Sequence, residues 1–186
     1  MPEGGYTGSV TTAAAAADHI RAVIRDVPDF PKPGIVFKDL TPVFQDAEAF
    51  SILVEAFAAR YRGAGIDAVV AIESRGFLLG APLAQKLGVG LALVRKHGKL
   101  PRETLQASYD LEYGSDKLEI HTDAVPKGAK VVLVDDLLAT GGTANAAKTL
   151  VEQIGGVVHE SAFIVELGFL PGRDKLGGEV FSLLTY

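Results

Sequence analysis

Four short segments of almost wholly apolar sequence constrain the fold of this chain more than any other feature. They are DAVVAI (67–72), GLALVR (90–95), VVLVDD (131–136) and SAFIVEL (161–167). A strand that is apolar at nearly every position is buried on both faces, as in a parallel sheet covered by helices. Helical patterns that end near Leu87 and run from about Gly142 to Ile154 separate these segments. The sequence therefore predicts an α/β fold with a twisted, mainly parallel sheet and helices on both of its faces.

The N-terminal part carries two helical patterns on either side of a proline-rich stretch. Apolar residues at helical spacing follow Thr12, and they are Ile20, Val23, Ile24 and Val27. The stretch PDFPKPGIVFKD (28–39) excludes a regular helix, so an extended loop is expected there. A second helix is predicted from about Asp46 until Gly63 ends it. Its apolar face consists of Phe50, Leu53, Val54, Phe57 and Tyr61.

Length and pattern indicate a single domain. A chain of 186 residues can bury roughly 70% of its unfolded surface in one core. Residues 1–11 are polar and rich in glycine and are expected to form a disordered extension, which leaves 12–186 as the domain. The long polar segment 95–123 ends in an alternating run, DKLEIH, and is expected to be a mobile loop on a β-ribbon.

Composition excludes several classes of function. A formal charge of −5 gives no support for a nucleic-acid-binding or acidic-membrane-binding surface. The absence of cysteine excludes disulfides, thiolate metal sites and a cysteine nucleophile. The N-terminus lacks the pattern of a signal peptide, and no run approaches the ~20 apolar residues that span a bilayer. A soluble, cytoplasmic protein is therefore expected.

The stretch VVLVDDLLATGGTA (131–144) combines an acid pair with a glycine loop. Asp135 and Asp136 end a predicted strand, where ligands bind in open α/β sheets. Thr140–Thr143 follow at the start of the next helix, where backbone N–H groups, hydroxyls and the helix dipole favour a phosphate. The P-loop and dinucleotide-binding motifs are both absent. A phosphorylated sugar fits both halves, because its phosphate suits the loop and its ring hydroxyls suit the carboxylates.

Basic residues cluster at the exit of another predicted strand. They are Arg95, Lys96 and Lys99, within an otherwise acidic chain. If the phosphorylated sugar carried a diphosphate leaving group, cations of this kind and Mg²⁺ would neutralise its charge. Because Mg²⁺ prefers oxygen ligands and keeps several waters, we expect diphosphate and ribose oxygens, rather than side chains, to hold it.

The acid pair and glycine loop resemble the phosphoribosyl-diphosphate signature of the type I phosphoribosyltransferases. Over roughly residues 18–186, further strings are similar to the adenine-specific branch of the purine members. They are PDFPKPGIVFKDLTPVF, ESRGFLLGAPLAQKLG, LVRKHGKLP, SYDLEYGSDKLEIH and FSLLTY. The resemblance implies the type I fold with an N-terminal hood at 12–45 and a flexible catalytic loop within 95–121. It implies transfer of a 5-phosphoribosyl group from phosphoribosyl diphosphate to N9 of adenine, giving AMP and pyrophosphate for purine salvage.

The resemblance also assigns residues. For the 5-phosphate it implies Ala139, Thr140, Gly141, Gly142 and Thr143, and for the ribose hydroxyls Asp135 and Asp136. For pyrophosphate it implies Ser74, Arg75 and Gly76, where the peptide joining residues 73 and 74 is typically cis, beside Arg95, Lys96 and Lys99. For adenine it implies Val36, Phe37 and Lys38, with Leu167 opposite. Many members carry Arg where this chain has Lys38, so the planar stacking of a guanidinium is lost.

Two acids in the long loop, Asp110 and Glu112, are candidates for the general acid/base that the reaction needs. The resemblance places the catalytic carboxylate at Glu112 and implies that Tyr113 helps to hold the loop closed. It further implies a homodimer in which the segment Arg95–Pro101 lies near the partner's active site.

Two alternatives remain. One is a transferase for hypoxanthine, guanine or xanthine, although enzymes for hypoxanthine and guanine carry an acid where this chain has Ala139. The other is a phosphoribosyl-diphosphate-sensing regulator without catalysis. Such a regulator needs a nucleic-acid face, whereas this chain is acidic and carries no separate helix-turn-helix.

Overall fold

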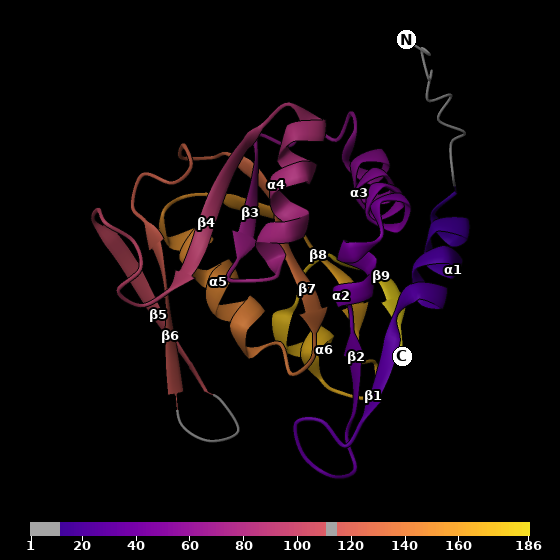
Figure 1. Cartoon of the computed structure of the whole chain (residues 1–186). Helices are drawn as coiled ribbons and strands as arrows, with labels where there is room; N and C mark the ends of the chain where they lie inside the picture. The colour runs from indigo at the N-terminus through magenta and orange to yellow at the C-terminus, as the bar shows by residue number, and fades with distance from the viewer. Residues whose placement is uncertain (1–11, 111–114) are drawn as a thin grey trace. The chain divides into compact units, whose positions relative to one another are not determined.

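The computed structural model describes residues 12–110 and 115–186, and the chain forms two compact units that divide after Phe57 (Figure 1). The N-terminal unit contains α1 (Ala13–Val23), β1 (Arg25–Pro28), β2 (Val36–Asp39), α2 (Thr41–Gln45) and most of α3 (Ala47–Tyr61). Strands β1 and β2 form an antiparallel two-stranded sheet. None of the helices in the described part of the chain is long and apolar enough to cross a bilayer.

The helical pattern of the sequence continues beyond the observed end of α1. The helix ends at Val23, and Val27 instead lies in β1, opposite Phe37 of β2. Pro28 explains the difference, because a residue before proline is driven from the helical to the extended conformation. The proline-rich stretch, expected as a loop throughout, ends in strand β2. Helix α3 agrees with its prediction, and Asp46 caps it by accepting from the backbone N–H groups of Glu48 and Ala49.

The larger unit is built on a seven-stranded sheet in the order β5-β6-β4-β3-β7-β8-β9. Its elements are β3 (Ala68–Ile72), α4 (Gly76–Leu87), β4 (Gly90–Lys96), β5 (Thr104–Asp110), β6 (Ser115–His121), β7 (Lys130–Leu138), α5 (Gly142–Gln153), β8 (Val157–Glu166), α6 (Gly172–Leu176) and β9 (Val180–Thr185). Strands β4, β3, β7, β8 and β9 are parallel, whereas β5 and β6 are antiparallel additions. The predicted mainly parallel α/β sheet is confirmed.

Alternating residues of the central strands pack against different helices. Val70, Ile72 and Leu133 belong to the hydrophobic cluster that contains the buried residues of α5. The intervening residues Ala71 and Val134 contact α4, where a Cβ at Gly80 would lie 2.5 Å from the Cβ of Ala71. Because successive side chains of a strand point to opposite faces, α4 and α5 cover opposite faces of the sheet.

Strands β5 and β6 form an antiparallel ribbon at one edge of the sheet (Figure 1). The run DKLEIH lies in β6, as predicted, and pairs with a strand that begins at Thr104, within the segment whose polar sequence suggested a loop. Leu105, Ala107 and Tyr109 pack against the hydrophobic core on alternate positions of β5. Together with the exposed polar residues Gln106 and Ser108 they make the period-two pattern of a half-buried strand, which the polar composition of the whole segment obscured.

Candidate active site

A cavity of about 590 Å³ opens at the carboxyl ends of β3, β4 and β7. Of the residues predicted for phosphoribosyl diphosphate, those that line it are Ser74, Arg75, Lys96, Lys99, Asp135, Asp136, Ala139, Thr140, Gly141, Gly142 and Thr143. Residues outside the prediction also line it, and they are Glu73, Tyr109, Leu137, Leu138 and Ala144. Strand ends that are far apart in the sequence thus bring the acid pair, the glycine loop and the cations to one cavity.

The glycine loop is shaped by a second backbone segment pressed against it. Gly141 has φ +78°, and a Cβ on it would lie 2.6 Å from the carbonyl oxygen of Gly172. A Cβ on Gly172 would in turn lie 2.2 Å from the carbonyl oxygen of Ala139. Only glycine fits at both positions, because side chains avoid positive φ at the first and no atom can occupy the space at the second. The loop ends at the N-terminus of α5, where free backbone N–H groups favour an anion.

Gly172, which the sequence analysis did not single out, gives a direct test of this packing. We expect Gly172→Ala to weaken the binding of a phosphate group in the glycine loop roughly tenfold and to lower the melting temperature, because forced overpacking costs about 1–3 kcal/mol. Gly90→Ala is the matched control, since a Cβ at Gly90 meets nothing within 4 Å. Equilibrium phosphate binding and thermal unfolding of both variants measure the effect. Wild-type behaviour of Gly172→Ala would refute the proposed role of this contact.

The acid pair lies near the end of β7 and is tied to the loop after β3. The carboxylate of Asp136 is nearly buried and accepts a hydrogen bond from Nε of Arg75. The Oδ1 atom of Asp135 accepts from the backbone N–H of Asp136 at 2.9 Å. Burial, together with the neighbouring charge of Asp136, raises the pKa of Asp135 well above its ordinary value. An environment of this kind favours ligands that bring hydrogen-bond donors or positive charge.

The loop after β3 contains a cis peptide bond between Glu73 and Ser74, as the resemblance implied. Ser74 and Arg75 line the cavity, whereas Gly76 does not. Gly76 begins α4 next to β7, and a Cβ on it would lie 2.9 Å from the carbonyl oxygen of Val134. Its lack of a side chain therefore allows α4 to approach the strand that carries the acid pair.

Glu73, which sequence reasoning missed, anchors the segment that carries the cations. Its carboxylate accepts hydrogen bonds from Nζ of Lys99 at 2.7 Å, from the backbone N–H of Lys96 at 2.8 Å and from Nε of Arg95 at 3.3 Å. Burial opposes its ionisation, but these donors together hold the pKa of Glu73 below its ordinary value. Glu73 is therefore a charged anchor at neutral pH.

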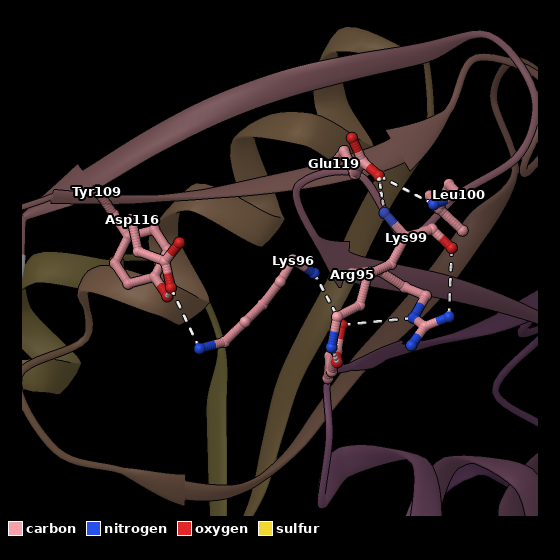
Figure 2. A network of polar contacts seen from close by, with 8 residues as sticks. Arg95, Lys96, Lys99, Leu100, Tyr109, Asp116 and Glu119 are labelled. Carbon is pink, nitrogen blue, oxygen red and sulfur yellow. Dashed lines mark hydrogen bonds and ion pairs between the residues drawn. The ribbon is translucent and has the colours of Figure 1, made fainter.

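Glu119 is a second anchor from the ribbon, and it also escaped the sequence analysis. It lies opposite Arg95 in the pairing of β4 with β6 and is almost fully buried. Its Oε1 atom accepts from the backbone N–H groups of Lys99 and Leu100, both at 3.0 Å (Figure 2). Burial opposes ionisation of this carboxyl too, but the backbone donors lower the pKa of Glu119. The two glutamates fix the position of the segment between β4 and β5.

Arg95 differs from the other predicted cations. It does not line the cavity, and its guanidinium donates to Glu73 and, at 3.3 Å, to the carbonyl oxygen of Lys99. It borders a second cavity of about 410 Å³, which is lined mainly by residues of β4 and of the segment 99–102. In the described part of this chain, Arg95 thus supports the segment that presents Lys99.

The residues predicted for adenine lie in different units. Val36, Phe37 and Lys38 form most of β2 in the N-terminal unit, where Phe37 makes an edge contact with Phe30. Nζ of Lys38 lies 2.7 Å from Oδ1 of Asp26. Leu167 follows β8 in the larger unit, and its backbone N–H donates to the carbonyl oxygen of Leu138. The predicted catalytic residues Glu112 and Tyr113 lie outside the described residues.

A glycine loop, an acid pair and a cation-bearing segment at the end of a parallel sheet define a phosphoribosyltransferase. The model of the phosphoribosyl transferase domain family matches residues 43–168. The adenine phosphoribosyltransferase of Geobacter metallireducens is 57% identical over 170 residues, which cover 91% of this chain and 99% of that protein. The chain therefore belongs to the adenine phosphoribosyltransferase family.

Solved structures agree with this assignment. The crystal structure of adenine phosphoribosyltransferase from Thermoanaerobacter pseudethanolicus is similar with a TM-score of 0.88 and 55% identity, covering 91% of this chain and 99% of that one. The enzyme from Saccharomyces cerevisiae, solved with adenine and an imino-altritol bisphosphate, has a TM-score of 0.89 and 46% identity with the same coverage. The likeness thus extends over nearly the whole of each chain.

Proposed function

We propose that this protein transfers the 5-phosphoribosyl group of phosphoribosyl diphosphate to N9 of adenine, forming AMP and releasing pyrophosphate, as a step of purine salvage. The observation that carries the proposal is the single cavity in which a phosphate-binding loop, an acid pair and three cationic side chains come together. Each part suits a different group of this one substrate. Similarity to the adenine phosphoribosyltransferases supports the choice of adenine.

The 5-phosphate binds in the glycine loop formed by residues 139–143. Its charge is met by the backbone N–H groups at the start of α5 and by the hydroxyls of Thr140 and Thr143. The ribose hydroxyls donate to the carboxylates of Asp135 and Asp136, which also favour the positive charge that develops on the ring carbon as the bond to the diphosphate breaks. Binding the phosphate at one end positions the ring carbon beside the acid pair.

The diphosphate leaving group binds at the opposite end, beside Ser74, Arg75, Lys96 and Lys99. Gly76 and Arg95 do not line the cavity. Gly76 allows α4 to pack closely on β7, and Arg95 supports the segment that presents Lys99. The oxygens of Asp135 and Asp136 are of the type that Mg²⁺ prefers, although Asp136 is already bonded to Arg75. The site therefore fits a Mg²⁺ ion held mainly by substrate oxygens, which neutralises charge on the departing diphosphate.

Adenine stacks on Phe37, and backbone groups near Val36 and Lys38 bind its edge. The resemblance adds Leu167 to the residues that bind adenine. Glu112 supplies the general acid/base and Tyr113 helps to hold the closed loop. The enzyme acts as a homodimer, and Leu78 on α4 and Leu91 on β4 offer exposed apolar surface to a partner. The phosphorylated substrate and product do not cross membranes unaided, which supports a cytoplasmic location.

Incubation of the protein with phosphoribosyl diphosphate, adenine and Mg²⁺ tests the function directly. The expected result is stoichiometric AMP and pyrophosphate, measured by chromatography and a coupled pyrophosphate assay. Binding of phosphoribosyl diphosphate without formation of either product would instead indicate a sensing protein.

The acid pair gives a more specific prediction. We expect Asp136→Asn to retain the fold and to lower kcat at least roughly tenfold, the scale of one lost charge-assisted hydrogen bond. The variant loses the charge that stabilises the ring carbon, and the hydrogen bond from Arg75 is left with a neutral amide oxygen as its acceptor. Circular dichroism and steady-state kinetics at saturating Mg²⁺ are the measurements. Full activity of this variant would remove Asp136 from the proposed mechanism.

A further inference from the structure

The three cations that line the cavity are each paired with a carboxylate, but the pairs differ in exposure. Arg75 is bonded to Asp136, and Lys99 is bonded to Glu73. The side chains of the two acids, Asp136 and Glu73, are only 6% and 9% exposed. Lys96 is paired with Asp116, and here the two side chains are 53% and 30% exposed. Water therefore reaches both members of the Lys96–Asp116 pair.

Asp116 is held in place by the ribbon and not by Lys96 alone (Figure 2). Its Oδ1 atom accepts from the backbone N–H of Lys117 at 2.8 Å, and its Oδ2 atom from the hydroxyl of Tyr109 at 3.3 Å. Nζ of Lys96 lies 3.2 Å from the same Oδ2. The backbone N–H of Lys117 and the ammonium group of Lys96 lower the pKa of Asp116. Asp116 is thus a fixed anion, whereas Lys96 reaches it through a flexible four-carbon side chain.

The cost of releasing each cation differs accordingly. Removing Arg75 from Asp136 takes a charged donor from a nearly buried carboxylate, which is strongly unfavourable. Glu73 keeps Arg95 and a backbone N–H when Lys99 leaves, but its side chain is only 9% exposed, so water cannot replace the lost ammonium group. Removing Lys96 from Asp116 leaves a carboxylate that water and two other donors still stabilise. Lys96 is therefore the cation that can exchange partners at low cost when a diphosphate enters the cavity.

We propose that Asp116 competes with the diphosphate for Lys96 and so limits how tightly the cavity holds it. The proposal rests on the proposed function, in which pyrophosphate is a product that must leave. Lys96 binds the diphosphate in the loaded site and returns to Asp116 in the empty one. An exchange of this kind favours product release, a step that often limits kcat in enzymes with closing loops.

Pyrophosphate binding, measured by titration calorimetry with Mg²⁺, tests the proposal. We expect Asp116→Asn to lower the Kd for pyrophosphate about two- to fivefold, the range set by an exposed ion pair. The Kd for ribose 5-phosphate, a probe of the other end of the cavity, should stay unchanged. Asp123→Asn is the matched control, because Asp123 is also exposed and paired, with Arg102, but lies outside the lining of the cavity. It makes the same change in net charge and should leave both constants unchanged.

A double-variant cycle assigns the effect to Lys96. Lys96→Met should weaken pyrophosphate binding, and adding Asp116→Asn to it should give no tightening. If the wild-type protein does not bind pyrophosphate, the proposed function itself fails. If it binds but Asp116→Asn leaves the Kd unchanged or raises it, the competition does not exist. The proposal would also be overturned if Asp123→Asn lowered the Kd for pyrophosphate as much as Asp116→Asn does. The same holds if Asp116→Asn still lowered this Kd in the Lys96→Met background, because either result would attribute the effect to net charge.

Discussion

Replacing Glu112 by glutamine is expected to lower kcat by about 10²–10⁴, the usual contribution of a general acid/base. Attack by N9 leaves a proton on the adenine ring, and a neutral amide can neither accept nor return it. The resemblance to the family assigns this role to Glu112. The affinity for phosphoribosyl diphosphate should change little, because its phosphate and ribose groups bind elsewhere. Single-turnover kinetics together with equilibrium binding measure the two effects separately.

Asp110→Asn is the matched control for this experiment. It removes the other acid of the SYDLEYG stretch with the same change of charge, and Asp110 ends β5. We expect its kcat to stay much closer to the wild-type value. An active Glu112→Gln enzyme, or an inactive Asp110→Asn enzyme beside it, would show that the catalytic carboxylate has been assigned to the wrong residue.

Adenine should be preferred over hypoxanthine and guanine by a factor of about 10⁴ in kcat/KM, because a site that pairs with a polar group rejects an analogue that cannot pair. The exocyclic amine of adenine donates hydrogen bonds, whereas hypoxanthine and guanine carry a carbonyl acceptor at the same ring position. A pocket with acceptors for the amine therefore leaves buried groups unpaired when either of the other bases enters.

Competition between the three bases at one concentration of phosphoribosyl diphosphate measures this preference. The nucleotide products separate chromatographically, so the ratio of rates gives the ratio of kcat/KM directly. Comparable rates for the three bases would contradict an adenine-specific pocket, while leaving the transfer of the phosphoribosyl group intact.

The parallel sheet could be predicted because it is encoded in local sequence. A buried strand such as Ala68–Ile72 is apolar at every position, and Gly142 begins α5 where the glycine loop suggested. The end of α1 could not be placed by helical spacing, since Val27 continues the pattern but pairs with β2. In that segment a proline and a long-range pairing outweigh the local propensity.

The parts of the site contained in one stretch were predictable, and the parts that depend on distant pairing were not. The signature of residues 131–144 carries both the acid pair and the glycine loop. Glu73, in the turn after β3, and Glu119, on β6, bind the segment 96–100, and no short pattern indicates that a glutamate will accept hydrogen bonds from backbone N–H groups. At Glu119 the alternation of DKLEIH even points the other way, because it groups this residue with the polar side chains of the strand, although Glu119 is almost fully buried.

The contact between Gly141 and Gly172 has a consequence for how sequences of this kind can be recombined. The two positions are 31 residues apart (141 and 172) and on different elements, yet Gly172 leaves no room for a methyl group at Gly141, and Ala139 leaves none at Gly172. Consider a chimera that takes β7 and α5 from one relative and the segment after β8 from another. Its phosphate-binding loop should function only if both relatives have glycine at these positions and pack the two backbone segments equally closely. Insertions between β8 and α6 should therefore be poorly tolerated, because they would shift Gly172 away from the glycine loop.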